Sequence, residues 1–215
     1  MRNRTSPARN IPGAPGAKRR AAEILPAAAK VFAQRGYHGA STQDIADVLG
    51  IRQASLYYYF ESKEAALEAV CIDGVEDYAL RAQAIHRSSG SAADKVAQLV
   101  IQHLAPLAER LDFTLVFLRE RRHLPQPARR RIRAIEKRYE KIIQKVIEQG
   151  VASGDFRADL DARMATLALL GLGNSAAAWY GREPGTTLER IAANYVDLLV
   201  RAFRTDAAPA IRRLH

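Results

Sequence analysis

The chain has 215 residues, of which 48% are hydrophobic, and a formal net charge of +10. This length suffices for one or two compact domains with a real core. No run approaches the ~20 consecutive apolar residues of a membrane-spanning helix, which excludes that class of protein. The positive charge predicts an anionic partner, namely nucleic acid, an anionic membrane surface or an anionic small molecule.

Residues 1–17 are rich in arginine, proline and glycine and contain little that could be buried, so we expect a disordered basic arm. The arm is either a passive tail or a segment that contacts phosphates or the minor groove beside a main DNA site. It has no apolar run, so we expect no secretory signal. Apolar residues at helical spacing predict a first helix over residues 18–35, ended by Gly36. Pro26 predicts a kink, or a helix that starts near Leu25 with the proline in its first turn.

Residues 41–60 show the pattern of two short helices joined by a tight turn. Ser41 is a good N-cap with Asp44 at the position of a capping-box carboxylate, and Gly50 tolerates the left-handed conformation that ends a helix. A second helix over residues 52–60 would leave facing outward Arg52, Gln53, Ser55, Tyr57 and Tyr58. Hydroxyls, an amide and a guanidinium without a carboxylate suit a polyanion, which favours a helix-turn-helix whose second helix enters the major groove. The alternative is a helical hairpin with ordinary surface tyrosines.

The amino-acid sequence of this region is more specific than its expected geometry. It matches a family pattern without a gap from residue 21 to about residue 70. It includes Thr42-Gln43-Asp44-Ile45-Ala46, Gly50-Ile51, and Ser55-Leu56-Tyr57-Tyr58-Tyr59-Phe60 followed by Ser62-Lys63-Glu64. These runs resemble the DNA-binding domain of the tetracycline-repressor (TetR) family. The chain departs from the family pattern at Pro26, inside the expected first helix, and at Tyr59, where a histidine is common. The resemblance implies contacts with operator DNA from Thr42, Arg52, Gln53, Ala54, Ser55, Tyr57, Tyr58 and Lys63.

The rest of the chain has helical periodicity and no convincing alternation of period two. Helices are expected over residues 62–87, 92–109, 113–122, 127–150, 162–180 and 187–203. Pro106 predicts that the second of these bends or ends early, and the glycines and alanines of residues 162–180 indicate close approach to the backbone. With the resemblance, this predicts an all-α fold of about nine helices. It comprises a three-helix helix-turn-helix domain (18–64), a helical ligand-binding and dimerisation domain (65–205) and a flexible tail (206–215).

The resemblance also implies an assembly and a mechanism. In that family the last two long helices of each subunit form a four-helix dimer interface, so we expect a cytoplasmic homodimer that binds a palindromic operator. The small-residue helix and the stripe of Ile191, Leu198 and Ala202 match that interface, and ordinary core packing is the alternative. An effector that binds the non-DNA conformation more tightly would move the helix that begins at Lys63 and release the DNA.

An effector needs a cavity among the middle helices. The candidate wall residues, each with plain core packing as its alternative, are Leu99, His103, Phe113, Phe117, Arg121, Tyr139, Ile143, Leu170, Asn174 and Trp179. Residues 119–125, the long helix and residues 171–180 resemble, more loosely, a TetR branch that senses acyl-CoA thioesters of lipid or steroid breakdown. Guanidinium groups suit the phosphates of coenzyme A. An arginine cluster lies in this region, with a solvated charged face as the alternative: Arg119, Arg121, Arg122, Arg129, Arg130, Arg131 and Arg133.

Enzyme signatures are weak. Residues 171–176 fit G-x-G-x-x-A, but a helix rather than a strand is expected before them. The histidines lack metal-ligand spacing, and Cys71 is the only cysteine, which excludes intramolecular disulfides and cysteine-rich zinc sites. We expect no enzyme, cofactor or metal.

Two alternative functions stay open. One is a regulator of drug efflux that senses aromatic or cationic compounds, which would need carboxylates inside its pocket, and few acidic residues fall on apolar faces. The other is a helical scaffold or enzyme that uses its basic surface for membranes or acidic proteins.

Overall fold

The computed structural model describes residues 15–204, with side chains from residue 23 onward. Over this range the chain forms α-helices and a short 3-10 helix without a strand, which confirms the all-α prediction. The expected disordered arm and flexible tail lie outside the described residues, except for residues 15–17, which begin the first helix. The elements are α1 (Pro15–Gly39), α2 (Thr42–Val48), α3 (Gln53–Leu56), α4 (Lys63–Arg87), α5 (Ala92–Leu104), α6 (Pro106–Glu109), α7 (Leu111–Glu120), η1 (Arg121–His123), α8 (Gln126–Ser153), α9 (Ala162–Trp179) and α10 (Leu188–Phe203).

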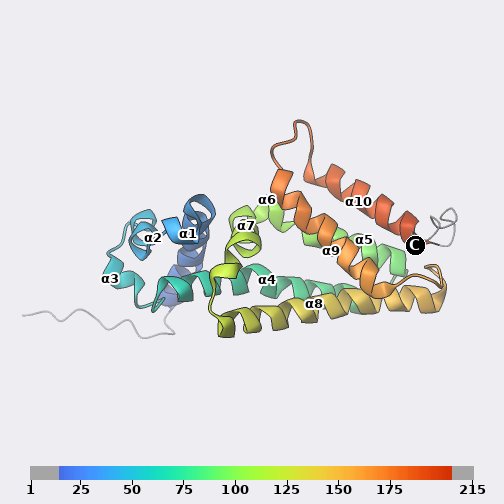
Figure 1. The fold of residues 1–215 in the computed structure, drawn as a ribbon, viewed down its shortest axis with the longest axis horizontal. Helices are drawn as coiled ribbons and strands as arrows, with labels where there is room; N and C mark the ends of the chain where they lie inside the picture. The colour runs from blue at the N-terminus through green and yellow to red at the C-terminus, as the bar shows by residue number, and fades with distance from the viewer. Residues whose placement is uncertain (1–14, 205–215) are drawn as a thin grey trace, which may run out of the picture.

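The described part is elongated, with a small head of α1, α2 and α3 at one end of a larger helical body (Figure 1). Helix α4 begins under the head and runs into the body, where α8 packs along it. Helix α5 packs on α4, and α9 and α10 in turn cover α5. Helix α7 packs against both α1 and α4, so it joins the head to the body.

Helix α1 is longer than expected, and it is interrupted at Gly36, where the sequence predicts its end. It starts at Pro15, so the alternative start near Leu25 is wrong, and its dihedral angles stay helical through Pro26. The angles depart from helical values only at Gly36, with φ 66° and ψ 170°. This left-handed φ suits glycine, and the chain then makes one further turn before α2.

The helix-turn-helix begins as predicted but its second helix is shorter. Ser41 and Asp44 form a reciprocal capping box at the start of α2, and Gly50 has a φ of 63°. Helix α3 covers only residues 53–56, so the expected helix over 52–60 is wrong. The amides of Tyr59 and Phe60 both donate to the carbonyl of Leu56, at 2.9 and 3.1 Å, and close a turn there. The turn returns Phe60 to the core just before the cap of α4.

The head does not have a core of its own. Its buried cluster combines α1, α2 and α3 with Leu67 and Val70 of α4, and continues into Val116 of α7 and Ile132 of α8. A second cluster fills the body between α4, α5, α8, α9 and α10. Close packing transmits displacements, so a shift of α7 or α8 reaches the head through direct contacts.

In the body, several predicted boundaries hold. Pro106 ends α5 early, as expected, and opens the short α6. Helix α8, expected over residues 127–150, has 28 residues and runs on to Ser153, where Gly154, with a φ of 82°, caps it. Arg121 and Arg122 lie in the 3-10 turn η1 rather than in the preceding helix, where they were expected. Within the described residues, no helix combines the length and apolar character needed to cross a membrane.

Candidate DNA-binding and effector-binding sites

The outer face of the head presents the residues predicted to read DNA. Tyr58 is 89% exposed and Tyr57 49% exposed, although both are large aromatic side chains. Arg52 and Ala54 are exposed beside them, and Gln53 and Ser55 are half-buried. Because two tyrosines in water have no packing reason to lie together, this surface fits contact with another molecule.

Thr42 lies behind this surface rather than on it. Its side chain is buried, and its Oγ1 accepts a 2.7 Å hydrogen bond from Nε2 of Gln53. The hydroxyl of Tyr57 lies 3.4 Å from the same oxygen. Thr42 was predicted to contact DNA; in this structure it positions two of the residues that face outward.

Lys63 also has partners inside the protein. Its Nζ donates hydrogen bonds of 2.9 Å to the carbonyls of Tyr37 and Ala40, and lies 4.3 Å from the centroid of the Tyr37 ring. Two of its three protons are therefore committed to the end of α1. These carbonyls compensate for the unfavourable position of a cation in the first turn of α4, a place that the sequence interpretation had explained by a bound phosphate.

A polar joint connects the head to α7. The amide of Tyr37 donates a 2.9 Å hydrogen bond to Oε2 of Glu120, and the imidazole of His123 lies 3.6 Å from the same oxygen. The rings of Tyr37 and His123 stack with centroids 5.3 Å apart. The Tyr37 hydroxyl donates to Glu64. Burial and this carboxylate raise the pKa of Tyr37 to about 12, and the same hydrogen bond lowers the pKa of Glu64.

The body contains a cavity of about 320 Å³ between α4, α5, α7, α8 and α9. This volume lies within the range of small-molecule sites, ~300–1,000 Å³. Six of the ten predicted wall residues line it: His103, Phe117, Arg121, Tyr139, Leu170 and Asn174. The cavity is therefore where the sequence interpretation expected an effector, among the middle helices.

The other four predicted wall residues do not line this cavity. Leu99 and Ile143 are fully buried in the body core, and Trp179 packs against that core from the end of α9. Phe113 faces a separate, smaller pocket, where the guanidinium carbon of Arg110 lies 3.9 Å from its ring centroid. The 3.6-residue period identified apolar faces, but it could not say which apolar residues border a void.

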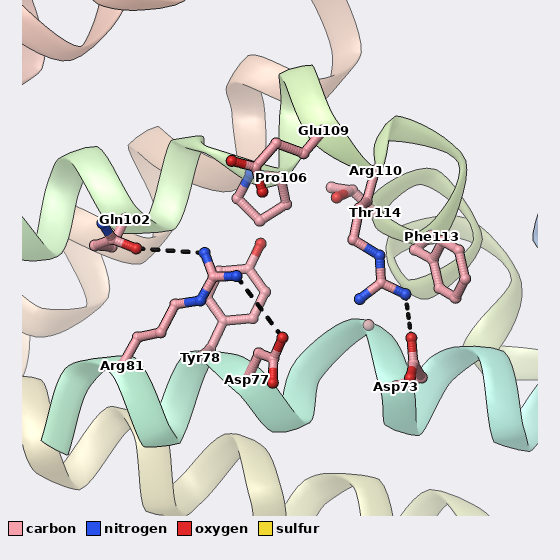
Figure 2. Close-up of a pocket in the computed structure, with 11 residues that line it drawn as sticks. Asp73, Asp77, Tyr78, Arg81, Gln102, Pro106, Glu109, Arg110, Phe113 and Thr114 are labelled. Carbon is pink, nitrogen blue, oxygen red and sulfur yellow. Dashed lines mark hydrogen bonds and ion pairs between the residues drawn. The ribbon is translucent and has the colours of Figure 1, made fainter. Parts of the chain in front are cut away.

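The smaller pocket lies between α4 and the α5–α7 segment (Figure 2). Its volume of about 20 Å³ suits roughly one water molecule. Arg110 forms an ion pair with Asp73, and Arg81 lies 3.7 Å from Asp77 and 3.4 Å from the amide oxygen of Gln102. The contacts of Arg110 with Asp73 and of Arg81 with Gln102 join α4 to its neighbours, and the pocket leaves little room for a ligand.

Ten further wall residues were not predicted: Gly74, Val75, Tyr78, Thr114, Leu118, Arg133, Glu136, Glu140, Leu167 and Gly171. The two glutamates correct the expectation of few carboxylates in the pocket. Residues 133, 136 and 140 recur at helical spacing beside Tyr139, so the period of α8 could have revealed them.

Arginines compensate both glutamates. Arg121 donates to Glu136 at 2.8 Å, and Glu140 accepts from Arg133 at 2.7 Å and from Arg163 at 2.8 Å. Burial would raise the pKa of Glu140, but the hydrogen bonds from Arg163 and Arg133 outweigh it and hold this pKa below its usual range. The cavity therefore offers paired carboxylates rather than a free negative charge.

The arginine cluster is divided between paired and free members. Arg121, Arg131 and Arg133 form ion pairs with glutamates. Four other members have exposed side chains without a carboxylate partner in the described part of the chain: Arg119, Arg122, Arg129 and Arg130. They lie at the end of α7, in η1 and at the start of α8, near the cavity residues Arg121 and Arg133 in sequence.

The cavity wall also carries a polar group formed by His103, Tyr139 and Asn174. The Nδ1 of His103 lies 3.2 Å from the Tyr139 hydroxyl, and its Nε2 lies 3.3 Å from Oδ1 of Asn174. Desolvation lowers the pKa of His103 to about 4, so the ring is neutral, and burial raises the pKa of Tyr139.

The dimer stripe predicted on the last helix is only partly available. Ile191 is buried in the body core, which leaves it out of any contact between subunits, whereas Leu198 is 55% exposed and Ala202 is exposed. On α9, Met164 is 60% and Leu167 41% exposed. Apolar side chains thus remain in solvent on both of the last two helices, and large exposed apolar groups mark contact surfaces.

Two family models match most of the chain. The model of bacterial regulatory proteins of the tetR family matches residues 24–70, and that of the tetracyclin repressor-like C-terminal domain matches residues 89–203. The fatty acid metabolism regulator protein of Bacillus subtilis (strain 168) is 26% identical over 179 residues, 83% of this chain and 92% of that protein. The HTH-type transcriptional repressor KstR2 of Mycolicibacterium smegmatis is 31% identical over 153 residues, 71% of this chain and 74% of the repressor.

Among solved structures, the chain is similar to the transcriptional regulator FadR from Bacillus subtilis in complex with stearoyl-CoA. The TM-score is 0.73 at 25% identity, and the match covers 86% of this chain and 100% of that one. The similarity includes both the head and the body, so the two parts are related to that regulator as one unit.

Proposed function

Because this chain belongs to the tetR family of bacterial regulatory proteins, we propose that it is a transcriptional repressor released from its operator by a small hydrophobic effector of the acyl-CoA class. The observation that carries the proposal is the 320 Å³ cavity, whose α7 wall is bonded to the DNA-reading head. Relatives that regulate fatty acid metabolism or bind stearoyl-CoA support the class of effector.

For DNA, the proposed contacts come from the exposed face of the head. Tyr57, Tyr58 and Arg52 face outward, while Thr42 and Lys63 hold that face in place through hydrogen bonds to Gln53 and to the end of α1. Two subunits that pair through α9 and α10 in the cytoplasm would present two such faces to major grooves about 34 Å apart on a palindromic operator.

For the effector, an acyl chain would occupy the cavity and the phosphates of coenzyme A would meet the exposed arginines nearby. Guanidinium groups bind phosphates through paired hydrogen bonds. A cationic drug fits this site less well, because Glu136 and Glu140 already have arginine partners. The paired carboxylates therefore favour the thioester over the drug-sensor alternative.

The effector would act by binding the non-DNA conformation more tightly. Phe117, Leu118 and Arg121 line the cavity from α7 and η1, and Glu120, between Leu118 and Arg121, binds the amide of Tyr37 in the head. A ligand that displaces α7 would thus alter the position of the head. Two heads that no longer match the groove spacing would release the operator.

A gel shift on the palindrome beside the protein's own gene tests the proposal. We expect a specific complex that octanoyl-CoA or a longer acyl-CoA dissociates, and that free coenzyme A and free fatty acid leave intact. If free coenzyme A also dissociates the complex, or if no thioester does, the effector is not an acyl-CoA. Affinities for specific and random duplexes against salt separate a sequence-reading regulator from a scaffold with a basic surface, because only the former shows a large specificity ratio.

A further inference from the structure

We propose that the cavity selects acyl groups that carry an oxygen substituent, a hydroxyl or a carbonyl, which His103, Tyr139 and Asn174 recognise together. This inference rests on the proposed function and concerns the same cavity. It adds that the acyl chain is functionalised rather than plain hydrocarbon.

The hydrogen bonds within the group determine where each proton lies. The Oδ1 of Asn174 can only accept, so the imidazole donates to it through Nε2, at 3.3 Å. A neutral imidazole has one N–H, so Nδ1 is an acceptor and accepts a hydrogen bond from the Tyr139 hydroxyl, at 3.2 Å. The two rings are nearly parallel, with an interplanar angle of 8°.

This arrangement leaves two unused groups at the cavity wall. The amide nitrogen of Asn174 has two donor hydrogens without an acceptor among the described residues, and the residue is exposed and lines the cavity. The Tyr139 hydroxyl already uses its only proton in the hydrogen bond to His103, and its oxygen keeps the capacity to accept one. A ligand carbonyl can accept from Asn174, and a ligand hydroxyl can bind both groups at once.

The backbone is adapted to hold the imidazole at this wall. A Cβ on Gly173 would lie 2.1 Å from Cδ2 of His103, so the ring fits only against a glycine. The Tyr78 hydroxyl lies 3.4 Å from the His103 carbonyl, and the Tyr78 ring packs against the imidazole. A plain hydrocarbon would cover the Asn174 donors without accepting a hydrogen bond from them. Buried donors without a partner lower the stability of the complex. An oxygen at this place avoids that penalty.

The test compares matched thioesters on the full-length protein. A cavity of about 320 Å³ holds roughly ten water-sized groups, which suits an eight-carbon acyl chain. Calorimetry would measure the affinity of octanoyl-CoA, its hydroxy isomers substituted at carbons 5 to 8, and the corresponding ketones. We expect at least one oxygenated isomer to bind about tenfold more tightly than octanoyl-CoA.

Two variants assign the preference to these residues. Asn174→Leu should abolish the preference for hydroxyl and carbonyl alike, so that the oxygenated esters bind no more tightly than octanoyl-CoA does to the same variant. Tyr139→Phe should reduce the preference for the hydroxyl more than that for the carbonyl. Gln149→Leu makes the same amide-to-leucine change at an exposed position of α8 outside the cavity, and should change nothing.

The outcomes separate this inference from the proposed function. If octanoyl-CoA binds as tightly as every oxygenated isomer, the inference is wrong and the acyl-CoA function stands. If no coenzyme A thioester binds, the function fails, and the same isomers are offered as N-acetylcysteamine thioesters. A preference for the oxygenated esters there, lost in Asn174→Leu, supports the inference on its own; equal binding or no binding of these esters overturns it.

Discussion

At the scale of single residues, two polar side chains that the sequence assigned to DNA contact also have partners within the protein. Thr42 accepts from Gln53, and Lys63 donates to the carbonyls of Tyr37 and Ala40. The residue type was informative, since each makes polar contacts, but a sequence pattern does not reveal whether the partner is DNA or the protein itself.

The role of Thr42 predicts the effect of removing its hydroxyl. Thr42→Val keeps the shape but leaves Gln53 and Tyr57 without their shared oxygen, so the reading surface loses its order. We expect operator affinity to fall about tenfold, the value of one hydrogen bond of about 1.4 kcal/mol, with little change in affinity for random DNA. Thr186→Val, in the loop before α10, is the matched control; equal losses in both variants would contradict the role.

His103 predicts a specific pH dependence of stability. Its pKa is about 4 in the folded protein and about 6.5 when unfolded. Between these values the unfolded state binds more protons, so the free energy of unfolding falls as the pH is lowered from 6.5 toward 4, by up to about 3 kcal/mol. Urea unfolding of the parent and of His103→Phe across this range measures it. The variant should show a shallower decline, and parallel curves would rule the prediction out.

At the scale of elements, the glycines of α9 are visible in the sequence, but their separate roles depend on the fold. Its glycines indicated close approach to the backbone, and at Gly173 the approaching group is the imidazole of His103. A Cβ added to Gly171, two residues earlier, would meet no atom within 4 Å. Identical residues in one helix thus differ in role because only one of them faces α5.

This difference predicts opposite effects of the same substitution. Gly173→Ala would place a methyl group against His103 and should destabilise the protein by about 1–3 kcal/mol. Gly171→Ala meets nothing and should stabilise α9 by about 0.5–1 kcal/mol, since alanine is the better helix former. Thermal unfolding of both variants measures the sign of each change in stability. Equal shifts would show that His103 moves aside for the added methyl group at little cost.

Breaking the joint between α7 and α1 should change how acyl-CoA affects operator affinity more than it changes operator affinity itself. Glu120→Ala removes the acceptor of the Tyr37 amide, so movement of α7 should reach the head less effectively. We expect operator affinity without effector to stay within a few-fold, while the loss of affinity caused by acyl-CoA becomes smaller. Gel shifts with and without effector test this, with Glu183→Ala in the α9–α10 loop as the control; an unchanged response in Glu120→Ala would exclude the joint.

At the scale of the whole molecule, the described subunit leaves apolar side chains of α9 and α10 in solvent. Leu198→Asp should therefore convert the proposed dimer to monomers and weaken operator binding, because one reading head cannot span a palindrome. Leu80, on α4, is 59% exposed, similar to the 55% of Leu198. Leu80→Asp is thus the control and should stay dimeric in analytical ultracentrifugation. A Leu198→Asp protein that remains dimeric would place the interface elsewhere.

The helices, their caps and the reading surface could be predicted from the amino-acid sequence, because these features depend on local spacing and on residues a few positions apart. Ser41 with Asp44, Gly50 and Pro106 each act within one turn of the chain. The short α3 could not be predicted, since the return of Phe60 to the core ends it.

The cavity and the polar joint between the head and α7 could be identified only in the folded molecule. His103, Tyr139 and Asn174 come from three helices, and Tyr37 meets Glu120 across 83 residues. Periodicity shows that a residue faces inward, but whether it then borders a void, a salt bridge or another side chain depends on how helices distant in sequence pack together.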